Sequence, residues 1–318
     1  MKNLIPLIAT ALLLISCERE TVTQWPSISD PYTELKINSG LEITDSNPNF
    51  ESGKTVFNAE FSKKVNWELT ITGESSKAKK IFTGKSKSIN EENATWDGST
   101  TIFPMFQKEA CTVELTFPTE SDTTLGGALT ILEVKPTPDD AILLSDFETN
   151  PNWKGVYIWN LNIVDDEVGN YAPQGKSYYS VGGEQIDWDW LSALAYIPVD
   201  QSSGKSLSVQ PDEVYFNALV NVAKDEEGEE YNFQELIFEF YEEDGDVYKA
   251  IFTELESDWQ TISLNYASIG STTGQNGNGI RNPDKINEVQ LLFIVDPTTT
   301  SKIDLDYLIF TQNEPLKP

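Results

Sequence analysis

Short segments in which apolar and polar residues alternate recur along the chain, separated by turn residues. A two-residue period puts successive side chains on opposite faces of a β-strand, so it predicts sheets with one buried face. After residue 140 no stretch has the longer period of an amphipathic helix. We therefore expect an all-β protein. The alternating segments are 55–61, 65–71, 111–117, 128–134, 236–241, 247–252, 259–264, 289–295 and 303–310.

The segments differ in length and spacing along the chain. Between residues 36 and 135 they recur roughly every ten residues, with turn residues such as Gly73 and Gly98 between them. That spacing is typical of an immunoglobulin-like sandwich. Residues 141–318 have longer strands and longer loops, which fit a jelly-roll sandwich. The expected fold is an N-terminal immunoglobulin-like sandwich followed by a C-terminal jelly roll.

A proline-containing segment, residues 136–140, coincides with a change in charge. Residues 1–140 carry 13 basic and 20 acidic side chains, a net charge of -7, whereas residues 141–318 carry 9 and 31, a net charge of -22. We therefore expect a spacer domain over 36–135, a linker over 136–140 and a second domain over 141–318.

The first 17 residues predict an exported lipoprotein. Lys2 precedes a short apolar run, residues 4–15, which is well below the roughly 20 residues of a membrane-spanning helix. Leu14-Ile15-Ser16-Cys17 matches the bacterial lipobox, in which the cysteine is diacylated and becomes the mature N-terminus. Residues 1–16 are then a signal peptide and residues 17–35 a flexible tether from lipidated Cys17. A plain secretory signal with an incidental cysteine is the alternative.

Composition narrows the possible chemistry. The chain has no histidine, which excludes Ser-His-Asp and Cys-His catalysis and histidine-ligated metals. With Cys17 acylated, Cys111 is the remaining thiol, and its alternating segment predicts a small buried residue. The formal net charge of -29 argues against a nucleic-acid partner. The remaining possibilities are catalysis by carboxylates, an oxygen-ligated cation such as calcium, and binding without catalysis.

Aromatic residues gather between residues 146 and 190, in segments rich in Gly, Asn, Asp and Pro. Sugar rings present apolar faces that stack on aromatic rings, and their hydroxyl groups need polar partners at the rim. Burial in the core is the competing interpretation for each tryptophan. The candidate glycan-binding residues are Trp153, Tyr157, Trp159, Tyr178, Trp188 and Trp190, with Asn276 and Arg281 of the glycine-rich loop 270–282 as rim donors.

Two sets of motifs resemble known modules. Trp67 in a W-x-L-x-I segment and Trp96-Asp97-Gly98 as a W-D-G turn resemble the FlgD-like immunoglobulin module, a family of spacers. Over residues 141–313, an opening D-F-E, a G-K-S-Y-Y-S-V segment, W-Q-T-I-S-L and a closing K-I-D-L-D-Y-L-I-F follow in order. This series is similar to the galactose-binding-like jelly roll of carbohydrate-binding modules.

Together with the lipobox and the acidic Glu18 and Glu20 behind it, the chain resembles the surface glycan-binding lipoproteins of Bacteroidota polysaccharide-utilisation loci. The resemblance implies a lipid-anchored outer-membrane protein on the cell surface, with a glycan-import transporter complex as a further partner. The periplasmic face of the membrane is the alternative location.

The same resemblance implies a structural calcium ion where the first and last strands of the jelly roll meet. The matching residues are Glu148 and Asp306, with Asp146 and Asp304 as further candidates. Calcium takes about 6–8 oxygen ligands, and the backbone carbonyls among them leave no mark in a sequence. Four solvent-facing carboxylates are the alternative interpretation.

The sequence therefore favours a non-catalytic cell-surface lipoprotein that binds a polysaccharide or oligosaccharide by aromatic stacking in its C-terminal domain. The charge of residues 141–318 favours a neutral glycan, because an acidic surface repels anionic polymers. Beyond the structural calcium, no cofactor is required. Two alternatives stay open. One is a glycosidase with two catalytic carboxylates, which needs no histidine. The other is a structural or adhesive surface protein whose aromatic residues all lie in the core.

Overall fold

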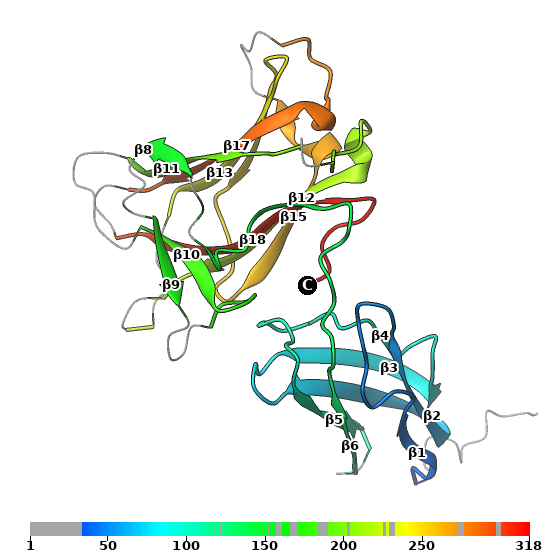
Figure 1. The fold of residues 1–318 in the computed structure, drawn as a ribbon. Helices are drawn as coiled ribbons and strands as arrows, with labels where there is room; N and C mark the ends of the chain where they lie inside the picture. The colour runs from blue at the N-terminus through cyan, green and yellow to red at the C-terminus, as the bar shows by residue number, and fades with distance from the viewer. Residues whose placement is uncertain are drawn as a thin grey trace, which may run out of the picture.

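The computed structural model describes residues 34–318 except 121–122, 150, 152, 157–160, 166–170, 183–189, 202–203, 225–226, 229–232, 272–276 and 297–299. Regular structure in the described residues is almost entirely β, as the alternation predicted. None of their helices is long and apolar enough to cross a membrane. Buried hydrophobic residues form one large cluster within residues 50–131 and another within residues 142–310. Figure 1 shows the two corresponding β-structures, with the C-terminal end of the chain between them.

The N-terminal β-structure is built around one long strand, β2 (Thr55–Gly73), whose alternate residues are buried from end to end. The sheet order is β1-β2-β5-β6, and β3 and β4 also pair with β2. The sequence predicted two strands here. The chain instead continues as one strand through the polar residues between the two segments. Its pairing with β3 shifts in register between Glu60 and Val65. The other strands are β1 (Ile37–Ile43), β3 (Lys79–Ile89), β4 (Thr95–Trp96), β5 (Ala110–Thr116) and β6 (Thr124–Thr130).

Large aromatic residues fill the N-terminal core. The ring of Trp96 makes edge contacts with Phe50 and Phe106 at centroid distances of 4.7 and 4.9 Å, and its indole nitrogen donates to the carbonyl of Ser99 at 2.9 Å. Cys111 is buried and unbridged, as predicted. Burial raises the pKa of its thiol to about 12, and the negative charges of Glu109 and Glu74 add to the rise. A thiol with this pKa stays protonated and unreactive at neutral pH.

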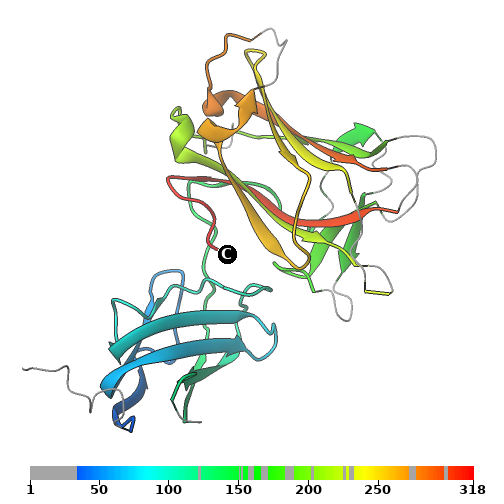
Figure 2. The same ribbon diagram turned by 180° about the vertical axis from the view of Figure 1, so that it is seen from behind.

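The C-terminal β-structure consists of two facing sheets (Figures 1 and 2). Sheet I has the order β15-β12-β18-β10-β9, with β7 also paired to β18, and sheet II has the order β16-β14-β13-β17-β11-β8. Sheet I contains β7 (Ile142–Ser145), β9 (Leu161–Asp165), β10 (Ser177–Gly182), β12 (Val214–Val222), β15 (Gln260–Asn265) and β18 (Lys302–Gln312). Sheet II contains β8 (Lys154–Val156), β11 (Leu191–Pro198), β13 (Glu235–Glu242), β14 (Val247–Phe252), β16 (Gly270–Ser271) and β17 (Ile286–Ile294). Among the described residues, the short 3₁₀ helices η2 (Pro211–Glu213), η3 (Tyr266–Ser268) and η4 (Pro283–Lys285) lie between strands.

The side chains between the two sheets follow the predicted alternation. In β13, Phe238 and Phe240 point into the core, whereas Glu239 and Tyr241 lie on the outer face. The predicted segments 236–241 and 247–252 fall in β13 and β14, which pair as an antiparallel hairpin. Phe216 of sheet I meets the two β13 phenylalanines at 4.9 and 5.1 Å, so the sheets are joined by aromatic contacts.

A bulge interrupts the alternation in β18. Ile303 and Leu305 point into the core before it, and Leu308 and Phe310 do so after it, which requires one extra residue between them. The pairing with β12 shifts at this place, and Tyr307 has a φ of 48°, in the left-handed region. The bulge turns Tyr307 to the outer face of sheet I.

The outer face of sheet I is covered by other parts of the chain. Tyr307, Ile309, Leu219 and Ala141 form a small buried cluster, and side chains from three separate segments pack on it: Phe103, Met105, Trp259 and Leu316. Backbone hydrogen bonds of Met105 to Pro173 (2.7 Å) and of Thr100 to Pro318 (2.6 Å) tie the N-terminal β-structure to the C-terminal one. Sheet I therefore faces protein on both sides.

A buried carboxylate in the N-terminal β-structure allows a stability test. Glu109 accepts hydrogen bonds from the amides of Ser75 (2.7 Å), Ser76 (2.9 Å) and Gln107 (3.1 Å), and from the Ser76 hydroxyl (2.5 Å). Glu109→Ala leaves these donors without an acceptor, at about 1–3 kcal/mol for each donor that stays buried. We expect a loss of about 2–4 kcal/mol in the free energy of unfolding, measured by urea denaturation. Glu114→Ala, at an exposed position on β5, the strand that follows Glu109, should change it by less than about 0.5 kcal/mol. Equal losses of stability in the two variants would contradict the role of Glu109 as the acceptor for these donors.

Candidate functional site

The outer face of sheet II carries a group of aromatic and polar side chains. We call this group the sheet II face; it consists of Tyr196, Glu239, Tyr241, Lys249, Glu288 and Gln290. All six are half-buried, so each ring or polar group is held by its neighbours while part of its surface meets solvent.

Strand pairing brings these residues together from four strands. Tyr196 of β11 pairs with Gln290 of β17, which pairs with Glu239 of β13, which pairs with Lys249 of β14. Tyr241 pairs with Glu288 one step further along the same strands. The two tyrosines lie two strands and two residues apart, roughly 12 Å at ordinary sheet spacings.

Apolar residues form a second row beside the first. Leu194, Leu292, Ile237 and Ile251 pair across the same four strands; Ile251 is 48% exposed and the two leucines are half-buried, whereas Ile237 is buried at 2%. An apolar strip therefore runs parallel to the polar row, on the same face of the sheet.

The polar groups of the sheet II face are linked to one another. The Tyr241 hydroxyl donates to Glu239 Oε2 at 2.9 Å, Lys249 Nζ lies 3.5 Å from Glu239 Oε1, and the Gln290 amide donates to Glu288 Oε1 at 2.7 Å. Burial raises the pKa of Tyr241, and its hydrogen bond to Glu239 raises it further. The phenol thus stays neutral and keeps its ring in a fixed position.

This arrangement suits a ligand with apolar faces and hydroxyl edges. The tyrosine rings and the apolar row offer stacking surface, the two carboxylates accept hydrogen bonds, and the amide and ammonium groups donate them. Held by their neighbours, these groups lose little conformational entropy when a ligand binds.

The predicted aromatic residues fall into three groups. Trp190, at the start of β11, is 57% exposed and remains compatible with ligand contact. Tyr157, Trp159, Trp188 and Asn276 lie outside the described residues, as does Cys17. Trp153 and Tyr178 have partners within the protein.

Burial of Tyr178 argues against the prediction that it faces a ligand, whereas Trp153 is half-buried and packs partly against the core. The Trp153 ring stacks on Tyr179 at 5.3 Å and makes an edge contact with Phe147 at 5.4 Å, as part of the wall of the core. Tyr178 is only 1% exposed, because Trp259 covers it in an edge contact at 5.5 Å. Loop-rich sequence around these residues suggested exposure, but segments distant in the chain close over them.

Arg281 also differs from its prediction as a rim donor. Its guanidinium group donates to the backbone carbonyls of Tyr266 (2.9 Å) and Ile269 and lies over the ring of Tyr248 at 4.1 Å. These contacts direct two of its five N–H donors to the backbone, so Arg281 holds the 266–269 turn in place.

The four predicted calcium ligands occupy different environments. Asp306 is fully buried at the β18 bulge, and its two oxygens accept from the amides of Gln174 (3.1 Å) and Tyr307 (2.7 Å). Burial raises its pKa well above the ordinary value, and the charges of Glu148 and Asp146 add to the rise, so the three carboxyl groups are neighbours. Asp304 is committed to the Ser180 hydroxyl (2.8 Å) and the Asn221 amide (3.1 Å), which argues against it as a ligand.

Gln174 adds an oxygen that the sequence did not indicate. Its side-chain Oε1 is buried and accepts no hydrogen bond, while its backbone amide donates to Asp306. Glu148 Oε1 accepts from the amides of Lys176 (2.7 Å) and Ser177 (3.0 Å) in the segment that follows Gln174. A buried oxygen without a partner, on a residue whose backbone contacts Asp306, is the kind of donor that a hard cation accepts.

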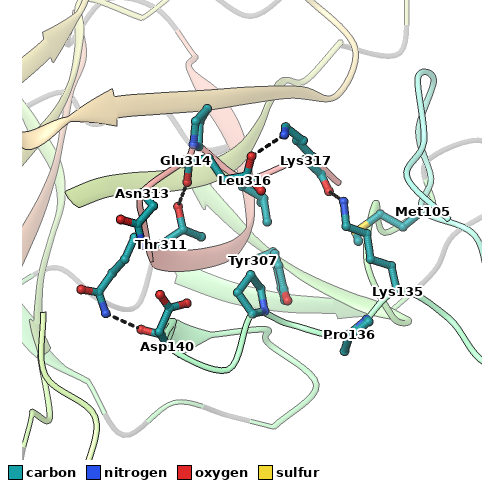
Figure 3. A pocket seen from close by; sticks show the side chains of 13 residues that line it. Met105, Lys135, Pro136, Asp140, Tyr307, Thr311, Asn313, Glu314, Leu316 and Lys317 are labelled. Atoms are coloured by element: carbon teal, nitrogen blue, oxygen red, sulfur yellow. Dashed lines mark hydrogen bonds and ion pairs between the residues drawn. The ribbon is translucent and has the colours of Figure 1, made fainter. Parts of the chain in front are cut away.

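A pocket of about 300 Å³ lies where the C-terminal end meets the 135–140 segment (Figure 3). Its polar groups are largely paired with one another. Lys135 donates to the carbonyl of Lys317 (2.8 Å) and forms an ion pair with Asp97 (3.2 Å), and Gln312 donates to the carbonyl of Asp140 (2.8 Å). The Thr137 and Tyr307 hydroxyls are hydrogen-bonded to each other at 2.6 Å. We therefore interpret this pocket as a structural joint.

A second pocket, of about 320 Å³, lies around Trp259 on the covered side of sheet I, with Phe103 and Tyr171 among its lining residues. The Trp259 indole nitrogen donates to the carbonyl of Tyr171 at 3.0 Å, which fixes the ring against the loop. Tyr171 is 51% exposed, so this pocket also presents an aromatic surface to solvent.

Sequence reasoning missed most of the sheet II face. It predicted an alternating strand over 236–241, which contains Glu239 and Tyr241, but it did not connect these residues with Tyr196, Lys249, Glu288 or Gln290. Aromatic and long polar residues at outward positions of neighbouring segments were the available signal. Which strands are neighbours, and in which register, is a property of the folded sheet.

Comparisons with known proteins give a limited picture. No family model matches the chain, and no curated protein matches it. Solved structures similar to it include a family 11 carbohydrate-binding module from Clostridium thermocellum in complex with a β-1,3-1,4-mixed-linked tetrasaccharide (14% identity, 54% of this chain and 95% of that one, TM-score 0.36). Another is SGBP-B from a complex xyloglucan utilization locus in Bacteroides uniformis (13%, 87% and 73%, TM-score 0.37). A third is the family 30 module of the cellulosomal cellulase Cel9D-Cel44B of Clostridium thermocellum (8%, 55% and 98%, TM-score 0.35). At these identities and TM-scores, the likenesses do not establish a function.

Proposed function

We propose that the chain is a non-catalytic protein that binds a polysaccharide or oligosaccharide on the sheet II face. The observation that carries this proposal is the placement of Tyr196 and Tyr241 beside two carboxylates, an amide and an ammonium group on one partly exposed sheet surface. Protein covers part of the outer face of sheet I, and among the described residues the sheet II face is a partly exposed flat surface.

The geometry favours an extended ligand. The two tyrosines are separated by about two strand spacings, so an oligosaccharide, rather than a single sugar, reaches both rings. Trp190, the residue before the strand that carries Tyr196, is 57% exposed and offers a further aromatic side chain. The predicted ligand residues Tyr157, Trp159 and Trp188 remain part of the proposal on sequence grounds.

Charge selects among glycans. Residues 141–318 carry 9 basic against 31 acidic side chains, and the sheet II face itself has two carboxylates and one ammonium group. A uronic acid or sulfate group brought to this surface meets negative charge, whereas a neutral sugar does not. We therefore propose a neutral glycan.

We also propose how the chain is presented. Lipidated Cys17 anchors it in the outer membrane on the cell surface, residues 17–35 act as a tether and the N-terminal sandwich as a spacer. A glycan-import transporter complex is the partner that receives the bound glycan. These points rest on the lipobox and on the resemblance of the sequence.

A structural calcium ion is proposed at the junction of β7 and β18. Asp146, Glu148, Asp306 and the side-chain oxygen of Gln174 are the residues that would hold it. A bound cation would neutralise the buried Asp306 carboxylate and supply a partner for Gln174 Oε1. Its part is to stabilise the fold, because these residues lie beside the β18 bulge and not on the sheet II face.

Substitutions of the sheet II tyrosines test the binding site. Tyr196→Ala and Tyr241→Ala each remove a ring that would bury roughly 60 Å² of apolar surface against a sugar, about 1.5 kcal/mol. We expect each variant to weaken binding about tenfold, measured by affinity electrophoresis in gels that contain a neutral polysaccharide found to retard the wild-type chain.

The control for this experiment is Tyr171→Ala, an exposed tyrosine beside Trp259. It should bind like the wild type. If binding falls in Tyr171→Ala and persists in both sheet II variants, the site lies at the Trp259 pocket. Release of reducing sugar from the polysaccharide would overturn the non-catalytic assignment in favour of a two-carboxylate glycosidase.

Ionic strength tests the choice of a neutral glycan. Raising NaCl from about 0.05 to about 0.5 M shortens the Debye length several-fold and screens repulsion from the acidic surface. We expect binding of a neutral polysaccharide to be unchanged, and any weak binding of a uronate-containing polymer to appear only at high salt. Tight binding of an anionic polymer at low salt that is lost at high salt would contradict the proposal.

Thermal unfolding tests the calcium site at Asp306. Without calcium, the raised pKa of Asp306 means that the folded state holds a proton the unfolded state releases, so this group favours folding at acid pH and opposes it at neutral pH. Calcium should therefore raise the Tm more at pH 7 than at pH 5, and Asp306→Asn should lose part of this increase. Asp304→Asn, on the same strand, should keep it. Equal calcium responses in the two variants would count against the site.

A further inference from the structure

A second group of carboxylates lies at the turn between β13 and β14, away from the β7–β18 junction. Glu242, Asp244 and Asp246 each offer an oxygen, and these oxygens all lie within 4.8 Å of one another. Ligand oxygens around a calcium ion lie about 2.3–2.6 Å from it, so they are separated by about 5 Å at most. Glu242 is 4% exposed and Asp246 is 7% exposed, so two of the three carboxylates are buried.

Each of the three carboxylates is held in place by hydrogen bonds to at least one of its oxygens. Glu242 Oε1 accepts from the Tyr266 hydroxyl (2.8 Å) and the Asn282 amide (2.7 Å). Asp246 accepts from the amides of Asn278 (2.8 Å) and Gly279 (3.0 Å). The side chains of Asn278 and Asn282 both donate to Asp244 Oδ2 at 3.0 Å. The donors come from residues 266–282, so a second segment fixes the geometry of the turn.

Three oxygen atoms at this place have no partner. Glu242 Oε2, Asp244 Oδ1 and the Tyr248 hydroxyl are buried and make no hydrogen bond. Burial raises the pKa of Tyr248 to about 12, and the charges of Glu242, Asp246 and Asp244 add to the rise, so its hydroxyl lies near the group. Buried polar atoms without partners are rare and cost about 1–3 kcal/mol each, which points to a ligand that satisfies them together.

The positive charges nearby are already engaged. Lys285 forms an ion pair with Asp244 through Oδ2 at 3.6 Å, the oxygen that already accepts two amide hydrogen bonds. Arg281 donates to the carbonyls of Tyr266 and Ile269. The unpartnered oxygens of Glu242 and Asp244 therefore receive no charge-assisted hydrogen bond from either side chain.

We propose that Glu242, Asp244 and Asp246 bind a calcium ion through the unpartnered oxygens of this turn. The donor set is all oxygen, and calcium accepts the irregular geometry and partial hydration that a turn provides, whereas magnesium demands a near-ideal octahedron. The ion ties the β13–β14 turn to residues 277–282. Because the turn ends the strand that carries Glu239 and Tyr241, the ion also fixes one end of the sheet II face.

Calcium titration of the purified chain tests the proposal. The probe is CaCl2 added to chelator-treated protein, and the number of bound ions is measured by isothermal titration calorimetry. Asp244→Asn and Glu242→Gln should each lose one equivalent of calcium, or bind it at least tenfold more weakly, relative to the wild type. Glu243→Gln is the matched control: it removes the same charge from the same turn at an exposed position, and it should bind calcium like the wild type.

A second background separates this site from the one proposed at Asp306. In Asp306→Asn, the remaining calcium binding should disappear when Asp244→Asn is added. Circular dichroism checks that each variant is folded, and Asp246→Asn replaces any variant that is not. Equal stoichiometry and affinity in the wild type, Asp244→Asn and Asp246→Asn would overturn the proposal. A folded Asp306→Asn variant that binds no calcium would also overturn it.

Discussion

The bulge in β18 is the feature on which the C-terminal β-structure depends. β18 pairs with β12 along one edge and with β10 and then β7 along the other, so a change of register in it affects the whole sheet. The extra residue lets Ile303 and Leu305 face the core on one side of the bulge and Leu308 and Phe310 on the other. It also places Asp306 and Tyr307 at the outer face, where Tyr307 meets Thr137 of the 136–140 segment. Core packing, the junction with the N-terminal β-structure and a buried carboxylate thus share one local irregularity.

The two outer faces of the sandwich therefore differ in how far they are covered by protein. Sheet I receives Phe103 and Met105 from the N-terminal β-structure and Leu316 from the C-terminal end, which removes apolar surface from water. Sheet II keeps a partly exposed surface, where Ile251 remains 48% exposed next to the row of polar and aromatic side chains. Apolar surface beside ordered polar and aromatic neighbours is the kind of surface that a bound ligand would remove from water.

Period-two patterning was enough to predict the strands but not their neighbours. Strands β13, β14, β17 and β18 lie where alternation predicted strands, because a strand with one buried face shows alternating polarity within its own segment. The 55–61 and 65–71 segments became one strand, since nothing in the polar residues between them forces a turn. The surroundings of Tyr178 and Trp153 were not predicted, because Trp259 and Tyr179, which pack on them, act through tertiary contacts. The sheet II face required the register of four strands, which depends on the pairing of residues up to about 100 positions apart.

The acidity of the chain has a structural explanation beyond solubility. Several buried or turn carboxylates are stabilised by backbone amides and not by lysine or arginine: Glu109 by three, Glu148 by two and Asp246 by two. A backbone N–H that points at an ionised carboxylate forms a charge-assisted hydrogen bond, and it is supplied by the turn itself. A chain with 22 basic and 51 acidic residues can therefore fold without matching each carboxylate to a cation. The carboxylates that keep an unpartnered oxygen, Glu242 and Asp244, stand apart from that pattern, because their turn supplies fewer donors than their oxygens accept.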